Sequence, residues 1–319
     1  MGTPLTIWMF VGFLLAAYSV VGNDSIQTLG TFIASNRKYK WYHLWFFMGS
    51  ILIFTIIYSW YINDGDISYG RLTRVPIVEI RWYHAIAPFV LFFMTRKGIP
   101  ASTSLLVLSA FSSAVLLEKV ILKSAIGYGL SATTAYLLWL WLSRWDEKTK
   151  PIKAKYRKHW RVFQWMATGF LWHSWLTHGL TNIAIFLPRN MNMYILLMVI
   201  IIMSAGLAYI FKSNGGKIQN IILSKKDTVY VRSATLIDLF YALVLIFFKE
   251  YNNIPMSTTW VFVGVLCGRE LAISTRLRDR YKFKEVFPIV GKDLLKLFFG
   301  LAVSVTVAFL FQYLGNVLE

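Results

Sequence analysis

Long apolar runs separated by short polar loops set the pattern of this chain. Runs near 20 residues are long enough, as helices, to cross a hydrocarbon core about 30 Å thick. The predicted spans are 5–21 with a continuation over 25–35, 41–61, 121–142, 162–186, 193–211 and 297–313. The pattern also predicts two helical hairpins, 83–98 with 101–117 and 234–250 with 255–273.

One stretch of sequence occurs twice, at the tips of the two predicted hairpins. Phe-Phe, Ile-Pro and Ser-Thr pairs recur in one order with a constant offset of 155 residues, as from Phe92 to Phe247. Proline lacks an N–H and disfavours helix in the residue before it. We therefore expect extended backbone before Pro100 and Pro255, and we expect each proline to open the next helix.

Hydroxyl side chains follow both prolines. On this interpretation Ser102, Thr103, Ser257 and Thr258 lie in the first turn of a helix, where free N–H groups and hydroxyls point at whatever lies ahead. Such a site suits an anion. The alternative is a pair of ordinary turns between helices, but two copies at matched spacing favour an anion site.

Composition places the chain in a membrane. Of 319 residues, 57% are hydrophobic and 15% are charged, whereas soluble domains average about 25% charged residues. The net charge of +18 does not indicate nucleic-acid binding, because the basic residues lie in short loops between apolar runs. The single cysteine, Cys267, excludes an internal disulfide and a cysteine metal site. The first apolar run has no basic residue before it, so we expect a transmembrane helix there and not a signal peptide.

Basic loops predict the topology, because they stay on the cytoplasmic side. The loops placed inside are 37–40, 145–161, 212–232 and 276–296, and the acidic segment 63–66 is then outside. This works only if each hairpin enters and leaves by one face. Each half then crosses three times, so the second half is inverted and the hairpin tips meet near the midplane. The predicted fold is an all-α integral membrane protein of two inverted-topology repeats, 1–144 and 162–319, joined by a basic cytoplasmic connector, 145–161.

The first span is interrupted by a polar group at membrane depth. Asp24 is its only carboxylate, and Asn23, Ser25, Gln27 and Thr28 add oxygens within about two helical turns. Hard oxygens around one carboxylate suit a small cation such as Na⁺, or a carried proton, and an unwound backbone would add carbonyls. The alternative is that Asp24 only caps the half-helix that follows.

The second interrupted helix carries Thr181 and Asn182 but no carboxylate. His173 and His178 are five residues apart, which does not place two ligands on one helical face, so we expect packing histidines and no metal site. Two tryptophan pairs, Trp172 with Trp175 and Trp139 with Trp141, are interpreted as interface belts or packing. The charged residues before the tips contact either each other or the anion, and the sequence leaves the choice open for Arg96, Lys97, Lys249 and Glu250.

These features together resemble the inorganic phosphate transporter family, the PiT or SLC20-type sodium–phosphate symporters. The resemblance rests on Asn23-Asp24 in a broken first helix, a related break in the fourth, and Pro-x-Ser-Thr twice in register. It covers both halves. It implies that the tip hydroxyls bind phosphate, namely Ser102, Thr103, Ser104, Ser257, Thr258 and Thr259. It also implies that the broken helices bind sodium, with Asn23, Asp24 and Gln27 matching the family motif in the first half and Thr181, Asn182 and Ile185 in the second.

Two residues depart from the family pattern. Asn182 stands where the family has Asp, and Ile185 removes an oxygen, so fewer sodium ions per cycle, or protons instead, would follow.

The predicted function is cation-coupled symport of inorganic phosphate across the cell (plasma or inner) membrane by a multi-pass protein, with Na⁺ or H⁺ as coupling ion and no other cofactor. Thr181 is placed with the substrate-binding residues.

Other functions remain as alternatives. Sulfate or another oxyanion is an alternative substrate on the same scaffold. A membrane enzyme acting on a phosphorylated lipid would use His84, His173 or His178 with Asp24, but Asp24 and Asp238 are too few and too far apart in sequence, so we expect no enzyme. A non-transporting membrane scaffold and a homodimer are both left open by the sequence.

Overall fold

The computed structural model describes residues 5–99, 101–111, 114–142, 152–216, 218–223, 230–251, 257–276 and 283–318. Within those residues every regular element is helical. The elements are α1 (Ile7–Ser19), η1 (Val20–Asp24), α2 (Ser25–Ser35), α3 (Trp41–Ile62), η2 (Arg71–Arg74), η3 (Trp82–Ala85), α4 (Ile86–Lys97), α5 (Thr103–Ser109), α6 (Ala114–Leu142), α7 (Ala154–Gly179), α8 (Thr181–Ala184), α9 (Met193–Lys212), α10 (Gln219–Leu223), α11 (Val231–Tyr251), α12 (Thr258–Arg276) and α13 (Phe283–Leu318). The all-α prediction is confirmed.

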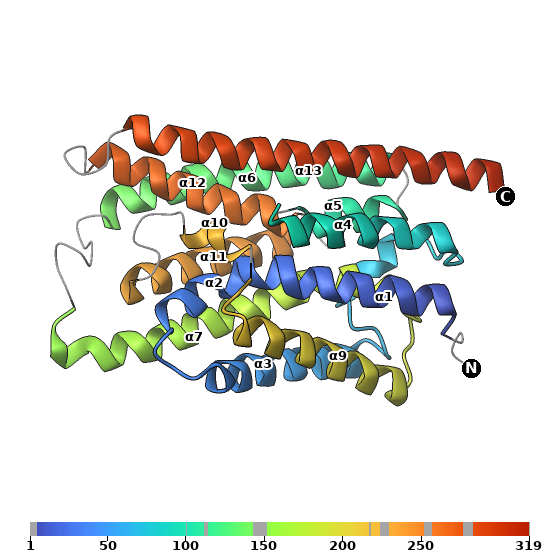
Figure 1. Ribbon diagram of the computed structural model, residues 1–319, viewed down its shortest axis with the longest axis horizontal. Helices are drawn as coiled ribbons and strands as arrows, with labels where there is room; N and C mark the ends of the chain where they lie inside the picture. Colours follow the sequence, from blue (N-terminus) through green and yellow to red (C-terminus); the bar gives the residue numbers. More distant parts are fainter. Residues whose placement is uncertain are drawn as a thin grey trace.

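The helices run roughly side by side along one long axis (Figure 1). Helices α3 and α9 lie on one flank, α6, α12 and α13 lie on the other, and α1 with α2 lies between them. Both chain termini lie at the same end, on the right of Figure 1. The first broken helix is therefore central to the bundle.

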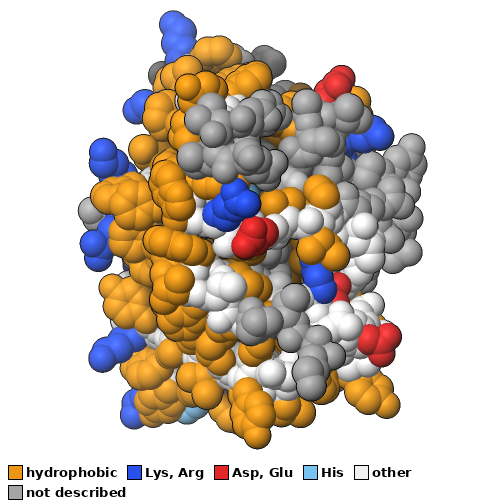
Figure 2. All heavy atoms as spheres, turned by 90° about the vertical axis from the view of Figure 1, so that its right-hand side faces the viewer, with side chains coloured by type: hydrophobic (Ala, Val, Ile, Leu, Met, Phe, Trp, Pro, Cys, Tyr) orange, Lys and Arg blue, Asp and Glu red, His pale blue; other side chains and the backbone are white. Residues whose placement is uncertain are grey.

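The central helix is more deeply buried than the outer ones. Four described helical segments are long and apolar enough to cross a membrane, namely 7–35, 41–62, 193–212 and 286–311. The most apolar window of the first is 61% buried, against 33% for each of the other three. Large hydrophobic side chains such as Phe46, Tyr194 and Phe309 are instead exposed. Figure 2 views the end that carries the termini and shows hydrophobic side chains covering one flank of the bundle. This is the surface of a membrane protein.

The two hairpins approach each other from opposite ends. In Figure 1 the pair α4 and α5 extends inward from the end that carries the termini, and α11 and α12 extend inward from the other end. Close contact holds the second hairpin against α6. A Cβ atom added to Gly264 would lie 2.7 Å from the Tyr128 carbonyl oxygen, and one added to Gly268 would lie 2.0 Å from that of Ala132. Only glycine permits this approach.

Several predicted boundaries were wrong. The predicted helix 101–117 is two elements, because α5 ends at Ser109 and α6 starts at Ala114 and includes the predicted span 121–142. Helix α7 starts eight residues before the predicted 162, inside the segment taken as a connector. Helix α13 starts inside the basic loop predicted over 276–296 and contains Pro288. Helices α7 and α13 thus continue into polar sequence beyond the apolar run, because a helix can extend past the membrane into water.

Candidate functional site

The break in the first helix is a π-helical turn. The chain does not unwind as expected, since η1 continues directly from α1 into α2. An inserted π turn changes the direction of the side chains that follow and is common at functional sites. Asn23 and Asp24 lie in this turn and are buried. Asp24 makes no capping hydrogen bond to α2, so the alternative of a simple helix cap is wrong.

Asn23 connects the broken helix to the first hairpin tip. Its Nδ2 donates to Asp24 Oδ1 at 2.7 Å and to the carbonyl oxygen of Ala101 at 2.7 Å. Gln27 Nε2 donates to Asn23 Oδ1 at 3.3 Å. The Thr103 hydroxyl is close to the Asp24 carboxyl group. The carboxylate, two amides and the first tip therefore form one polar cluster.

The second tip reaches the same carbonyl oxygen. Thr259 Oγ1 donates to the carbonyl oxygen of Ala101 at 3.2 Å. Residues 158 positions apart along the chain are thus in direct contact. The two tips and the first break converge on the Ala101 carbonyl oxygen, which is buried.

The two tips share one local structure. Ser102 Oγ accepts from the Leu105 N–H at 3.1 Å, and Ser257 Oγ accepts from the Trp260 N–H at 3.3 Å, at the same offset of 155 residues. These serines therefore cap helices that start at Thr103 and Thr258. The expectation that the helices start at the prolines was wrong by about one turn. Pro100 and Pro255 themselves, with Ile254, lie outside the described residues.

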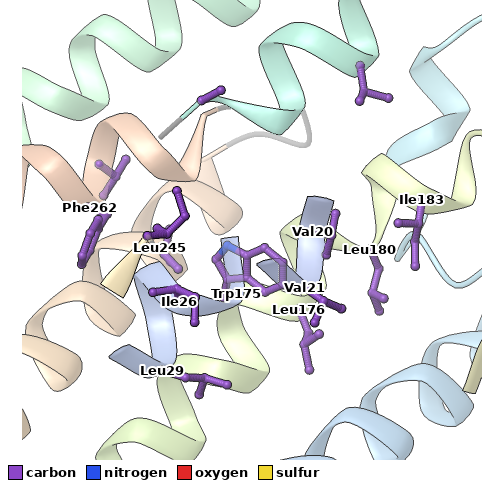
Figure 3. Packing of buried hydrophobic residues seen from close by; sticks show 14 of the residues in the cluster. Val20, Val21, Ile26, Leu29, Trp175, Leu176, Leu180, Ile183, Leu245 and Phe262 are labelled. Carbon is purple, nitrogen blue, oxygen red and sulfur yellow. The ribbon is translucent and has the colours of Figure 1, made fainter. Parts of the chain in front are cut away.

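Two aromatic side chains hold the second tip, a role that the sequence did not suggest for either of them. Trp175 Nε1 donates to Thr258 Oγ1 at 3.1 Å, and the Tyr241 hydroxyl donates to the Thr258 carbonyl oxygen at 3.0 Å. Trp172 and Trp175 stack with their ring centroids 5.2 Å apart, and both are buried, so of the two interpretations given for this pair, interface belt or packing, packing is confirmed. Figure 3 shows Trp175 amid the buried cluster, between Val21 on one side and Ile26 on the other. Trp139 is buried, whereas Trp141 is exposed.

Four predicted site residues carry polar atoms that are buried and make no hydrogen bond within the described part of the chain. The atoms are Gln27 Oε1, Thr103 Oγ1, Thr181 Oγ1 and Asn182 Oδ1; of these, Thr103 Oγ1 lies close to the Asp24 carboxyl group but outside hydrogen-bond geometry. Buried polar groups are nearly always hydrogen-bonded, so an orphan in a native structure needs an explanation. All four can accept from a ligand or coordinate a cation. Ser104 is also buried, while Ser124 Oγ accepts from the backbone N–H of Ser257 at 2.9 Å.

The second break contains Thr181 and Asn182 on α8, which packs against α1 and α5. Beside it, Arg71 Nε donates to the Thr177 carbonyl oxygen at 2.9 Å. Burial lowers the pKa of Arg71 to about 10, so this guanidinium stays charged at neutral pH. Ile185 is buried and apolar. The second break thus has amide and hydroxyl oxygens beside a fixed positive charge.

The remaining polar candidates lie elsewhere. His173 Nδ1 is 2.9 Å from Thr55 Oγ1, and His178 Nδ1 is 2.8 Å from the Ser174 carbonyl oxygen, as packing histidines would be. Arg96 and Lys97 are exposed, and Arg96 lies over the Phe92 ring at 5.3 Å. The side chains of Lys249 and Glu250 lie outside the described residues.

Fold and site together define an all-helical membrane protein in which two hairpin tips meet a broken helix. A solved structure described as "The sodium-dependent phosphate transporter" is similar to this chain, with a TM-score of 0.63 and 14% sequence identity. The match covers 97% of this chain and 99% of that chain. No protein-family model matches the sequence, and no curated protein matches it. The resemblance inferred from the residues is therefore confirmed at the level of the fold.

Proposed function

We propose that this protein is a multi-pass, cation-coupled symporter of inorganic phosphate in the cell (plasma or inner) membrane. The observation that carries the proposal is the Ala101 carbonyl oxygen, which accepts hydrogen bonds from both Asn23 and Thr259. One residue of the first tip thereby joins the broken helix to the second tip. The fold shared with a sodium-dependent phosphate transporter supports the same function.

In this proposal the anion lies between the tips. The α12 N-terminus and the tip hydroxyls would hold the phosphate oxygens; the hydroxyls belong to Ser102, Thr103, Ser104, Ser257, Thr258 and Thr259. A helix N-terminus supplies roughly half a positive charge, which does not neutralise a phosphate dianion. A co-bound cation would supply the rest, and Na⁺ fits the oxygens of Asp24 and Gln27.

The second break completes the proposed site. The orphan oxygens of Thr181 and Asn182 would face bound ligand, with Thr181 on the substrate and Asn182 on the cation. Alternating access would come from movement of one repeat, 1–144, against the other, 162–319, around this fixed site. The basic connector would lie in the cytoplasm and both termini outside.

Counterflow of radiolabelled phosphate into proteoliposomes tests the proposal. Phosphate-loaded liposomes with the protein should exchange label, and uptake should depend on sodium or on pH. Uptake should be lost in Asp24→Asn and in Ser102→Ala combined with Ser257→Ala. Exposed Asp64→Asn is the matched control, because it removes a carboxylate far from the site at a left-handed position that Asn accepts. Arsenate and sulfate competition identifies the oxyanion. Absence of counterflow in the unaltered protein would refute the function, and full activity in both site variants would refute the site.

A further inference from the structure

A second carboxylate lies buried between the two broken helices and the second hairpin. Asp238 on α11 accepts from Thr31 Oγ1 of α2 at 2.6 Å and from Thr168 Oγ1 of α7 at 2.5 Å. All three side chains are at most 1% exposed. Figure 1 shows α2, α7 and α11 running past one another at this level.

Among the residues that the structure describes, no cation is paired with this carboxylate. Within the described residues Asp238 forms no ion pair, and its hydrogen bonds are the two from threonine. Helix α11 packs against α2, α6, α7 and α12. The buried or half-buried charged residues and histidines on these elements, on α11 itself and on the turn before α2 are Asp24, Lys123, Arg161, His173, His178, Arg232, Arg269 and Glu270. Arg269 is already paired with Glu270 at 2.7 Å. A buried carboxylate without a cation is costly, so it carries a proton or a metal ion, and ionisable groups at membrane depth usually serve a function.

Asp238 belongs to a line of buried and half-buried polar residues that leads away from Asp24. Thr31 follows Asp24 by seven residues, which is about 10 Å along a helix. One turn further, Gln164 Nε2 donates to Ser35 Oγ, and Asn36 Nδ2 donates to Gln164 Oε1 at 3.1 Å. We call this line the α2–α7 polar seam; its members are Thr31, Ser35, Asn36, Arg161, Gln164, Thr168 and Asp238.

The seam ends at the surface. Arg161 Nη1 donates to Asn36 Oδ1 and to Gln164 Oε1, each at 2.9 Å, and Arg161 is only half-buried. In the proposed topology this end faces the cytoplasm, because the basic loop 37–40 lies there. The seam therefore leads from Asp238 to one side of the membrane, and its inner end lies about 10 Å along the helix from Asp24.

Asp238 also has a short route to the second tip. Tyr241 lies three residues on, on the same face of α11, and its hydroxyl donates to the Thr258 carbonyl oxygen. A change in charge at Asp238 acts on α11, on α2 and on α7 at once. A merely structural link between the three helices would not need an ionisable group, since an amide would hydrogen-bond to both threonines.

We propose that Asp238 is a proton-binding site of the transport cycle, loaded and released through the α2–α7 polar seam. The proton adds to a carboxylate oxygen of Asp238 and leaves from the same atom, with no other bond formed or broken. The site offers one carboxylate and two hydroxyls, which suffices for a proton but is few for a dehydrated metal cation. The inference rests on the proposed phosphate symport.

The experiment separates exchange from coupling in proteoliposomes. Phosphate-for-phosphate counterflow needs no net proton movement, whereas accumulation driven by a pH gradient does. Asp238→Asn should keep counterflow within about twofold and lose pH-driven accumulation, together with the proton uptake that accompanies phosphate, read with a pH-sensitive dye trapped inside. Asp64→Asn should keep all three. Accumulation that stays pH-driven in Asp238→Asn, or a loss of sodium dependence in place of pH dependence, would overturn the proposal.

A second variant distinguishes loss of the proposed proton site from misfolding. Thr31→Val combined with Thr168→Val keeps the carboxylate but removes both donors that stabilise its charged form. Half-maximal pH-driven accumulation should then move to higher pH, and an unchanged midpoint would overturn the proposal. Absence of counterflow in the unaltered protein would refute the transporter itself, which is a different result from either failure of the Asp238 site.

Discussion

The two helix breaks occupy related places in the two halves but differ in charge. The first is a π turn that buries Asp24. The second is a turn at Leu180 followed by α8, which carries the buried Asn182 and has the guanidinium of Arg71 nearby. Within the described part of the chain, both breaks leave amide or hydroxyl oxygens without hydrogen bonds. Both breaks thus carry polar oxygens, but of the two only the first carries the negative charge that would attract a cation.

The two tips are more alike than the two breaks. Both begin with a serine whose hydroxyl accepts from the N–H three residues later. They differ in length, since α5 has seven residues and α12 has nineteen. A longer helix aligns more peptide dipoles, so the second tip contributes more positive potential to an anion. In the proposed mechanism the anion site is therefore built from two similar tips, whereas the cation site has its carboxylate at the first break.

The largest effect is expected from Asp24→Asn, which removes the charge that distinguishes the first break. Loss of one partner from a buried charge pair costs about 3–5 kcal/mol, so cation affinity should fall roughly 100-fold or more. Sodium and pH titrations of phosphate uptake measure this. If the cation dependence of uptake is unchanged in Asp24→Asn, the first break does not bind the cation.

A smaller effect is expected when the breaks are made alike by Asn182→Asp. The added carboxylate should create a second cation site, so the charge moved per phosphate should rise and the cation dependence should steepen. Electrical recording on supported membranes gives that charge directly. Asn182→Ala is the control, because it removes the amide without adding charge. Equal stoichiometry in the aspartate variant and the unaltered protein would show that the second break binds no cation.

The tips can be compared by removing one hydroxyl at a time. Ser257→Ala should lower phosphate affinity about tenfold, a loss of about 1.4 kcal/mol, and Ser102→Ala should lower it less because α5 is short. Each also loses about 1 kcal/mol of capping free energy. Ser102→Thr and Ser257→Thr keep the hydroxyl and should behave nearly as the unaltered protein. A larger loss from Ser102→Ala would reverse the ranking of the tips.

The smallest effect on transport is expected at His84, which lies before α4 at the end that carries the termini and acts on stability instead. It stacks on Phe111 with ring centroids 4.8 Å apart, and burial lowers its pKa from 6.5 to about 4. Between these pH values the unfolded chain binds a proton that the folded protein does not, so stability falls as pH drops through this window, by up to about 1.4 kcal/mol per pH unit. His84→Phe should flatten this dependence in thermal unfolding between pH 6.5 and 4. If stability depends on pH with the same slope in His84→Phe, then other groups cause this pH dependence.

Part of the candidate site was predictable because it depends on neighbours in sequence. The repeated Pro-x-Ser-Thr stretch identifies both tips, and Asp24 stands out because carboxylates are rare in apolar runs. Composition and the length of the apolar runs were enough to predict the all-α fold. Helix boundaries were less accurate at α5 and α13, where polar residues stay helical or a helix breaks without a proline or glycine signal.

The sequence by itself determined that the chain is helical and crosses a membrane, that one stretch occurs twice, and that one break carries a carboxylate, since each follows from local composition. Only the tertiary structure decided that Trp175 holds Thr258 and that Asp238 lies between Thr31 and Thr168. Those hydrogen bonds join residues 83, 207 and 70 positions apart. No local pattern specifies such a pairing, because it depends on how whole helices pack and on which face each one turns inward.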